Sequence, residues 1–373
     1  MSAGALSAGK RLATPSVSKR VAPIVVVGGS GFLGCNLADS FLRDGEDVII
    51  LDNLSRAGVE RNLEWLAGNH GASVHAALID IRDFAAIEPV FREAKAVFHF
   101  AAQTAVTTSL LQPIDDFETN ARGTINVLEA TRRAGRNAPV ILASTNKVYG
   151  ALADMEMMEL DGRYMPTDET TRRFGVSEKR PLDFCTPYGC SKGVADQYVL
   201  DYAKSYGLPT AVLRMSCVYG PRQFGTEDQG WVAHFLLSAL AGERISIYGD
   251  GKQVRDILHV SDAVAAYRAV LGSIDRFKGR AFNLGGGPAN AVSVAEVLRE
   301  IELLLGRPLA TMKSEWRAGD QFFFVADTRA LREALGWKAR MAWRRGLRDL
   351  HAWLVEHRVH ARAALRQPRR IIA

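Results

Sequence analysis

Cysteine is scarce in this chain of 373 residues, and no pattern pairs the cysteines or provides a metal site. The four of them, Cys35, Cys185, Cys190 and Cys217, form no C-x-x-C motif and have no matching histidine pattern. We therefore expect no disulfide framework, no metal and a reduced, cytoplasmic setting. No run of 18 apolar residues exists, and the first 22 residues lack the apolar core of a secretory signal. The sequence thus predicts no membrane partner.

Acidic residues are missing from both ends of the chain. Residues 1–22 and 358–373 hold nine of the 47 Lys and Arg residues and no Asp or Glu, so the rest of the chain is slightly acidic despite the net charge of +6. Nucleic acid is therefore not expected as a partner. We expect a disordered basic tail over 1–22 and a second basic tail over 358–373. Binding of an acidic surface and, for 1–22, organellar targeting are the alternatives.

The first half of the chain alternates short apolar runs with amphipathic stretches. Hydrophobic residues make up 47% of the chain, which is enough for a large core. Near-continuous apolar strands separated by helical patterns indicate a parallel sheet covered on both faces. We therefore predict an α/β fold with a doubly wound parallel sheet. The predicted strands are 23–27, 47–51, 74–79, 96–101, 140–144 and 210–215.

Three glycines follow the first predicted strand at three-residue spacing. Gly28, Gly31 and Gly34 stand between that strand and a helical run over 35–43. Glycines there permit a tight turn and close approach of the backbone to a pyrophosphate, whose charge a helix N-terminus stabilises. Asp52 ends the second strand, where a carboxylate binds adenosine ribose hydroxyls and repels a 2′-phosphate. The pattern predicts NAD rather than NADP, and Arg56 weakens that preference unless it is merely a solvated loop cation.

Two further strand ends fit a dinucleotide lying across the carboxyl edge of the sheet. Asp80 and Ile81 follow the third strand and are expected to bracket the adenine, although helix capping is the ordinary alternative for such an aspartate. Ala101, Ala102 and Gln103 follow the fourth strand and are small enough for close approach of the cofactor.

Tyr188 and Lys192 are four residues apart, so on a helix they share one face. An ammonium there lowers the pKa of the phenol and turns the tyrosine into a general base. An exposed helix face is the ordinary alternative for a lone Tyr-x-x-x-Lys pair, but this pair lies downstream of a glycine loop. The fifth strand ends in Ser144-Thr145, and a Thr145 hydroxyl beside Tyr188 completes a Thr-Tyr-Lys triad.

These motifs resemble the extended short-chain dehydrogenase/reductase family with its Rossmann fold, in particular the nucleotide-sugar epimerases and dehydratases. The resemblance implies that Tyr188 is the base, that Lys192 holds it and the nicotinamide ribose, and that Thr145 bonds the reacting sugar hydroxyl. It adds Phe32, Leu33, Asn53 and Asn120 as cofactor contacts. It covers residues 24–355 and rests on Gly28-x-x-Gly31-x-x-Gly34, His99-Phe-Ala-Ala102, Asn120-x-x-Gly123-Thr, Val148-Tyr-Gly150, Tyr188-x-x-x-Lys192, Val218-Tyr-Gly-Pro221 and Gly249-Asp-Gly-x-x-x-Arg255-Asp-x-x-His259-Val.

Within the family, several longer runs resemble the subgroup that inverts C2 of CDP-sugars rather than the galactose 4-epimerases. Dehydratases carry Thr-Asp-Glu ahead of the tyrosine, whereas this chain has Ser144-Thr-Asn-Lys, which argues against loss of water. Two positions depart from the family pattern, with Ile79 in place of a Gly and Ala318 in place of a Pro. The alternatives are a 4-epimerase or another sugar-modifying member of the family, and a non-catalytic NAD-binding protein. The runs that carry the resemblance are 52–56, 144–149, 187–193, 214–223 and 225–232.

The predicted reaction needs cations for the substrate phosphates. When Tyr188 takes the hydroxyl proton and NAD the hydride, a sugar carbinol becomes a ketone, and return of the hydride to the other face inverts the centre. Arg255 and Arg317 are the predicted phosphate ligands, with a surface ion pair as the alternative for each. Gln229 and Trp231 are expected to face the sugar, unless they belong to the core. The resemblance adds Arg222 and Asp320.

The chain divides into two unequal regions. Residues 23–217 are expected to form mainly the NAD-binding domain, and residues 218–357 mainly a smaller substrate-binding lobe with returns to the main sheet. The segment 151–187 has few periodic signals and is expected to be a long irregular loop with a function, because Tyr188 follows it directly. We expect a homo-oligomer.

Overall fold

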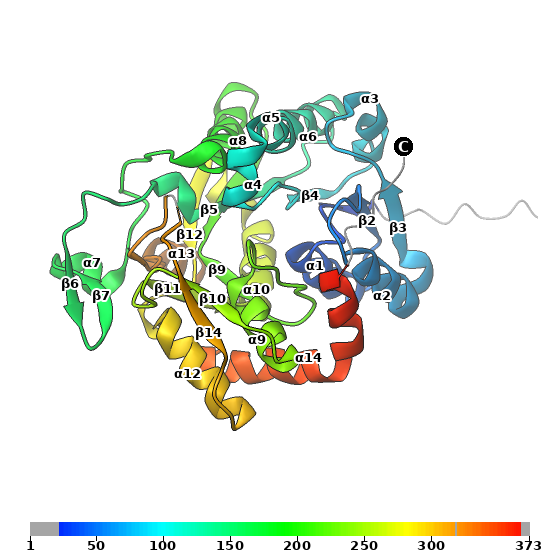
Figure 1. Cartoon of the computed structure of the whole chain (residues 1–373). Coiled ribbons are helices and arrows are strands. Elements are labelled where there is room, and N and C mark those ends of the chain that lie inside the picture. Colours follow the sequence, from blue (N-terminus) through cyan, green and yellow to red (C-terminus); the bar gives the residue numbers. More distant parts are fainter. Residues whose placement is uncertain (1–21, 318, 367–373) are drawn as a thin grey trace, which may run out of the picture.

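A parallel sheet of seven strands forms the centre of the molecule (Figure 1). The computed structural model describes residues 22–317 and 319–366, and the strands lie in the order β12-β8-β5-β4-β1-β2-β3. The strand order reverses at β1, which pairs with β2 on one side and β4 on the other. The strands are β1 (Ile24–Val27), β2 (Val48–Asp52), β3 (Val74–Leu78), β4 (Ala96–His99), β5 (Val140–Thr145), β8 (Thr210–Met215) and β12 (Arg280–Leu284).

All six predicted strands are present, and their ends shift by two residues at most. The sheet also contains β12, a return from the second half of the chain that the sequence did not locate. β3 departs from the expected burial: it is the last strand of the sheet, and Leu78 is 59% exposed. An edge strand has a neighbour on one side only, so near-continuous burial does not apply to it.

Helices cover both faces of this sheet, which confirms the doubly wound α/β fold. Alternate residues of β1 point to opposite faces. Ile24 and Val26 pack with α1 and α10, whereas Val25 and Val27 pack with α6 and α8. The first face carries α1 (Phe32–Leu42), α2 (Glu60–His70), α10 (Val260–Leu271), α11 (Ile274–Phe277) and α13 (Arg329–Leu335). The second face carries α3 (Phe84–Ile87), α6 (Gly123–Arg133) and α8 (Thr186–Ser205). Beside α8 lie α4 (Val106–Leu111), α5 (Pro113–Phe117) and the π-helical turn η3 (Glu118–Arg122).

A second core lies beside the sheet and is built mainly from residues after β8. Val232, Leu236, Ile257, Ile301 and Leu350 are buried together there. A capping box of Ser293 and Glu296 starts one of its helices. Its elements are β9 (Cys217–Tyr219), β10 (Ile245–Tyr248), β11 (Val254–His259), β13 (Ala291–Ser293), β14 (Thr311–Ser314), β15 (Phe323–Phe324), α9 (Trp231–Ala241), α12 (Val294–Leu305) and α14 (Trp343–Arg366).

The expectation of an irregular loop over 151–187 is wrong in its middle part. β6 (Met157–Leu160) and β7 (Arg163–Pro166) form an antiparallel hairpin, and α7 (Glu169–Phe174) follows. Asp161 and Gly162 make the two-residue turn, both with positive φ (52° and 73°). Asp-Gly between two short strands is a strong hairpin signal, so the sequence contained the information.

The backbone of α14 continues to Arg366, past residue 358, where the second basic tail was expected to begin. The predicted tail over 1–22 lies outside the described residues except for Ala22, and Ala318 also lies outside them. In the part of the chain that the structure describes, no helix is both long and apolar enough to cross a membrane. No group of His, Cys, Asp and Glu side chains suited to a metal occurs in that same part.

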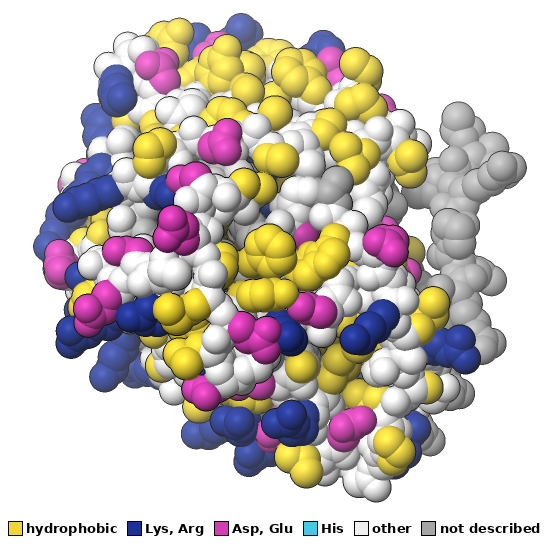
Figure 2. Space-filling view, turned by 60° about the vertical axis from the view of Figure 1, so that its left-hand side comes forward, with side chains coloured by type: hydrophobic (Ala, Val, Ile, Leu, Met, Phe, Trp, Pro, Cys, Tyr) yellow, Lys and Arg dark blue, Asp and Glu magenta, His cyan; other side chains and the backbone are white. Residues whose placement is uncertain are grey.

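Hydrophobic side chains gather at the top of the molecule in Figure 2, where Figure 1 places α4, α5 and α8. Leu111 is 82% and Ile114 73% exposed, and Phe117 and Tyr198 are also exposed. Apolar side chains grouped in this way commonly mark a surface that meets another protein.

Candidate active site

The loop between β1 and α1 admits only glycine at two of its three motif positions. Gly28 has a φ of 77°, and a Cβ there would lie 2.5 Å from the backbone N of Ala101. A Cβ on Gly34 would lie 2.3 Å from the carbonyl O of Gly28, so its absence lets α1 start close to the loop. Gly31 meets only that carbonyl, at 3.1 Å. The outer side of the loop is thus open to a pyrophosphate.

The first turn of α1 offers unused hydrogen-bond donors. Gly31 is the N-cap and no side chain caps the helix, so the backbone N–H groups of Phe32 and Leu33 have no partner within the helix. Both side chains pack against the core, which leaves their backbones for a cofactor. The Ser30 hydroxyl is buried and has no hydrogen-bond partner among the described residues. This cradle fits an anionic dinucleotide.

Asp52, at the end of β2, is anchored to the glycine loop. Its carboxylate accepts a hydrogen bond from the backbone N–H of Ser30 at 3.0 Å on one oxygen and from that of Leu54 at 2.9 Å on the other. Burial raises the pKa of Asp52, and the backbone hydrogen bonds oppose that shift. These backbone donors hold the carboxylate at the end of β2, the position that suits the ribose hydroxyls of a dinucleotide.

Arg56 is not the solvated loop cation considered from the sequence. It is half-buried, and burial lowers its pKa. In the described part of the chain, no carboxylate offsets that shift. A cation in this state favours a neighbouring anion.

The ends of β2 and β3 are joined by a hydrogen bond from Asn53 Nδ2 to Asp80 Oδ2 at 2.9 Å. Side-chain hydrogen bonds from Arg82 lower the pKa of Asp80 to about 2. The capping alternative for Asp80 is wrong, because Asp83 caps α3. The Ile81 side chain is buried in the core, so only its backbone remains for an adenine.

The loop after β4 is held in shape by its own polar side chains. Ala101 N donates to Val27 O at 2.9 Å, which keeps Ala101 and Ala102 beside β1. Asn120, in η3, accepts from the backbone N–H of Gln103 at 2.8 Å and donates to its carbonyl O at 3.0 Å. The Gln103 side chain turns back onto the loop and donates to the carbonyl O of residue 105 at 2.9 Å. The side chains of Gln103 and Asn120, predicted as cofactor contacts, therefore fix the loop.

Thr145, Tyr188 and Lys192 are brought together by the end of β5 and the start of α8. Tyr188 and Lys192 lie one turn apart on α8, and both are buried. The Thr145 hydroxyl is close enough to the Tyr188 phenol to lower its pKa. Lys192 Nζ donates to the carbonyl O of Ala143 at 2.7 Å. The exposed-face alternative for this Tyr-x-x-x-Lys pair is thereby wrong, and one strand fixes the hydroxyl and the ammonium.

The prediction that Lys192 lowers the pKa of Tyr188 is wrong for the structure as it stands. Burial raises the pKa of Tyr188 to about 12, and the hydrogen bond with Thr145 acts in the opposite direction. Burial lowers the pKa of Lys192 to about 8, although Asp196 and Asp116 oppose that shift. Burial disfavours the charged form of both groups, and the ammonium is directed at a backbone carbonyl rather than at the phenol.

Arg255 belongs to a charge cluster with Asp320 and Lys147. Its Nη2 lies 2.6 Å from Asp320 Oδ1, and Lys147 Nζ lies 3.8 Å from the same oxygen. The Arg255 side chain is 10% and that of Asp320 20% exposed. The pair is therefore largely buried, and the surface ion pair considered for Arg255 is wrong.

Arg317 lies beside the run that contains Gln229. Its guanidinium stacks on the ring of Tyr248, 3.9 Å from the ring centre, and donates to the carbonyl O of Glu227 at 3.1 Å. An Asp228 carboxylate oxygen lies 3.6 Å from it. Arg317 Nε and Gln229 Oε1 are buried without hydrogen-bond partners in the described part of the chain. Polar atoms left in this state suit a ligand.

Trp231 and Arg222 are placed differently from Arg317. Trp231 begins α9, and its ring meets Phe235 edge-on, with centroids 5.4 Å apart, at the margin of the second core. The Arg222 guanidinium lies 3.7 Å from the ring centre of Trp65 and 5.7 Å from that of Trp353. Arg222 thus packs among tryptophans of α2 and α14 and does not join the Arg255 cluster.

Comparison with known proteins identifies the family of this chain. A profile described as the NAD dependent epimerase/dehydratase family matches residues 24–285. The chain belongs to this family. The predicted class of NAD-dependent enzyme is thereby confirmed.

The chain is 40% identical to CDP-paratose 2-epimerase of Salmonella typhi, covering 88% of this chain and 98% of that protein. It is 32% identical to a putative UDP-glucose 4-epimerase of Methanocaldococcus jannaschii, covering 89% and 98%. Among solved structures, Thermus thermophilus UDP-glucose 4-epimerase in complex with NAD superposes with a TM-score of 0.74 at 29% identity, covering 89% of this chain and 99% of that one.

Three side chains that were not predicted from the sequence also belong to the candidate site of this family member. They are those of Asn146, Lys147 and Gln321. Lys147 donates to the carbonyl O of Gly319 at 3.2 Å. Asn146 Nδ2 donates to Gln321 Oε1 at 3.2 Å, and Gln321 Nε2 donates to the carbonyl O of Gly150 at 2.6 Å. These bonds tie the segment after Thr145 to the loop that carries Asp320. The signal available in the sequence was that Asn146 and Lys147 directly follow the predicted catalytic residue Thr145.

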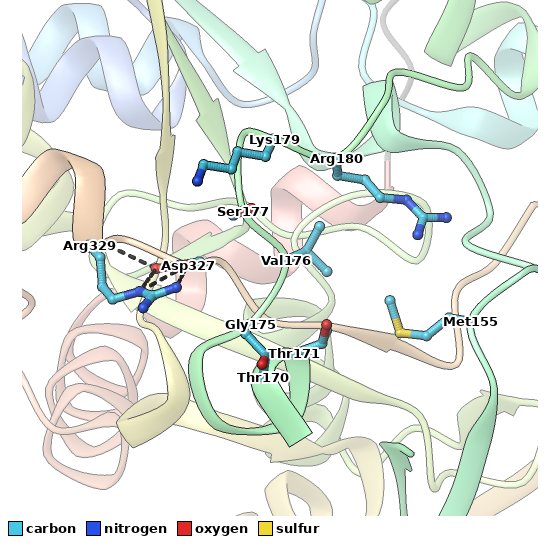
Figure 3. A pocket seen from close by; sticks show the side chains of 10 residues that line it. All are labelled: Met155, Thr170, Thr171, Gly175, Val176, Ser177, Lys179, Arg180, Asp327 and Arg329. Carbon is cyan, nitrogen blue, oxygen red and sulfur yellow. Dashed lines mark hydrogen bonds and ion pairs between the residues drawn. The ribbon is translucent and has the colours of Figure 1, made fainter. Parts of the chain in front are cut away.

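A separate pocket of about 220 Å³ opens beside α7 (Figure 3). None of the predicted cofactor or substrate residues lines it. One of its cations is already paired, because Arg329 Nη2 lies 2.7 Å from Asp327 Oδ2. Its lining comprises Met155, Thr170, Thr171, Gly175, Val176, Ser177, Lys179, Arg180, Asp327 and Arg329.

Proposed function

We propose that this protein is an NAD-dependent epimerase that inverts C2 of a CDP-sugar through a transient ketone. One observation carries the proposal: a complete Thr145-Tyr188-Lys192 triad in a chain that is 40% identical to CDP-paratose 2-epimerase over nearly the whole length of both proteins. The intact triad speaks against the non-catalytic alternative.

The cofactor is held by the ends of β1, β2, β3 and β4. The open side of the loop at Gly31 and the free N–H groups of Phe32 and Leu33 hold the pyrophosphate. Asp52 binds the adenosine ribose, and the backbone at Ile81 borders the adenine. Arg56, the uncompensated cation nearby, serves the phosphates rather than the bulk solvent.

Tyr188 and Thr145 act on the reacting hydroxyl of the sugar. When bound, NAD supplies the acceptor and the donor of the hydride. Tyr188 takes the hydroxyl proton and later returns it, while Thr145 holds the sugar oxygen. The ammonium of Lys192, fixed on Ala143 O, lies one helical turn from the phenol and stabilises negative charge that develops there.

The substrate is held by Arg255, Arg317 and Asp320. Arg255 and Arg317 bind the diphosphate by charge-assisted hydrogen bonds. The unpartnered Gln229 Oε1 accepts from a sugar or base group, with Trp231 beside it.

A 4-epimerase is the second candidate, because relatives at 32% identity carry that name. NMR analysis of products separates the two, with CDP-, GDP-, UDP- and dTDP-sugars incubated in D₂O. We expect inversion at C2 of a CDP-sugar with no solvent deuterium at that carbon, since a hydride held on the cofactor does not exchange with water. Inversion at C4 would replace the proposed carbon, and deuterium at the inverted carbon would overturn the hydride mechanism.

We further propose a homo-oligomer that pairs through α4, α5 and α8. The exposed apolar side chains of Leu111, Ile114, Phe117 and Tyr198 support this surface (Figure 2). A cytoplasmic location stays a prediction. Light scattering of the wild type and of Leu111→Glu tests the assembly, and an unchanged mass would remove this surface from consideration.

A further inference from the structure

Lys147 is a largely buried cation that the function proposed above does not use. It lies two residues after Thr145 in the 3₁₀ turn η4 (Asn146–Tyr149), and its side chain is 22% exposed. Its ammonium donates to the carbonyl O of Gly319 at 3.2 Å and lies 3.8 Å from Asp320 Oδ1. A lysine loses side-chain freedom and solvation when it is held in this way, so its charge needs a compensating anion.

The charges around Lys147 do not balance. In the described part of the chain, Asp320 is the carboxylate that faces it, and Asp320 already pairs with Arg255 at 2.6 Å. Burial and the charge of Arg255 lower the pKa of Lys147 to about 8, while Asp320, Cys217 and Cys185 oppose that shift. Two cations thus share one carboxylate. A further anion at this place would be stabilised by both.

The position of Lys147 along the chain indicates which anion this is. In the function proposed above, the reacting carbon of the sugar lies at the hydroxyls of Thr145 and Tyr188. From Thr145 the backbone turns toward Arg255 and Asp320, and Lys147 lies on that turn. An anion bound by Lys147 therefore sits between the reacting carbon and the proposed diphosphate ligand Arg255.

The chemistry of a nucleotide sugar fits this spacing for one carbon in particular. C2 is bonded directly to the anomeric carbon that carries the phosphate, whereas C4 lies across the ring from it. An enzyme that oxidises C2 must hold this phosphate close to its base, here Tyr188. Lys147 can hold the phosphate there, because it follows the catalytic Thr145 by two residues.

We propose that Lys147 binds the sugar-linked phosphate of the substrate and thereby places C2 at Tyr188. The choice of C2 rests on the proposed function, while the phosphate contact does not depend on it. The hydrogen bonds of Asn146 and Gln321 hold the two segments together at this point. Lys147 is thus a substrate-binding residue that determines which carbon reacts.

The test compares nucleotides with and without that phosphate. Calorimetric titration of the NAD-bound protein with CDP and CMP is carried out for the wild type, Lys147→Met and Lys147→Arg. We expect Lys147→Met to bind CDP about 10- to 100-fold more weakly, as for loss of a charge-assisted hydrogen bond, and CMP within about twofold of the wild type. Lys147→Arg should recover part of the CDP affinity. Equal losses for CDP and CMP, or no loss for either, would overturn the proposal.

Controls separate a local structural effect from the phosphate contact. Lys179→Met removes an exposed lysine of the pocket in Figure 3 and should leave both affinities unchanged. If Lys147→Met does not fold, Lys147→Gln keeps a donor for the Gly319 carbonyl without the charge and gives the same contrast. If the wild type prefers another base, the matching diphosphate and monophosphate replace CDP and CMP. In that case the function proposed above fails while Lys147 is still tested.

Discussion

The cofactor half of the site is assembled from neighbouring strand ends, whereas the substrate half is assembled from segments far apart in the chain. Ser30 and Asp52, which shape the cofactor loop, are 22 residues apart. Lys147 and Gly319, which meet in the substrate half, are 172 residues apart. A site made from successive strand ends follows from the fold class. A site made by distant loops depends on how two cores pack together.

The two halves also differ in what holds their charges. In the cofactor half, backbone N–H groups serve Asp52 and are free at α1. In the substrate half, side chains compensate one another, as in Arg255 with Asp320. Apart from proline, no substitution removes a backbone donor, so the substrate half is expected to be the easier one to alter.

The largest effect is expected at the boundary between the halves. Tyr188→Phe should lower kcat by about 10²- to 10⁴-fold, because only the proton acceptor is lost. Bound NAD, measured by absorbance after denaturation, should stay at the wild-type level. Tyr198→Phe, an exposed tyrosine on the same helix, is the matched control. Activity near that of the control would remove Tyr188 from the role of base.

Gly28→Ala should damage the cofactor half alone. The new Cβ meets the Ala101 backbone at 2.5 Å in a residue with φ of 77°, so a loss of about 1–3 kcal/mol in unfolding free energy and most of the bound NAD is expected. Gly45→Ala has a similar φ of 81° and nothing within 4 Å of its Cβ, and it should retain NAD. Equal NAD content in the two variants would contradict a steric requirement at the loop.

Arg255→Gln should damage the substrate half alone. Loss of a charge-assisted contact predicts a KM about 10- to 100-fold higher for the nucleotide sugar, with bound NAD unchanged. Arg348→Gln, an exposed arginine on α14, is the control. Steady-state kinetics and NAD content are measured on both. If Arg255→Gln also lost NAD, the two halves would not be independent.

A pH dependence of stability is also expected, and two buried lysines contribute to it. Burial lowers the pKa of Lys192 and of Lys147 from 10.5 to about 8. Between about pH 8 and 10.5 the unfolded chain binds more protons, so these two groups make the NAD-free protein more stable as pH rises through that window. Denaturant titrations across pH for the wild type, Lys147→Met and Lys192→Met measure each share. If the dependence of the unfolding free energy on pH were identical in all three proteins, neither lysine would have a pKa that differs between the folded protein and the unfolded chain.

Much of the cofactor half could be predicted because its requirements are local. Gly34 is dictated by backbone geometry within a few residues, Gly28 by its positive φ and by the adjacent strand end at Ala101, and Asp52 by the length of one β-α-β passage. The triad residues Tyr188 and Lys192 follow from helical spacing in the same way. The Asp161-Gly162 turn is equally local. Its Asp-Gly pair is a hairpin signal that the prediction of an irregular loop over 151–187 did not take into account.

The sequence by itself therefore determined the doubly wound sheet, the glycine loop and the pairing of Tyr188 with Lys192 on one helix face. Only the tertiary structure decided that Lys192 turns to Ala143 O, that Arg222 packs between tryptophans, and that Lys147 meets Asp320. The physical reason is that desolvation and side-chain pairing depend on which distant segments share a volume. Periodicity and spacing describe neighbours along the chain, and these charges are governed by neighbours in space.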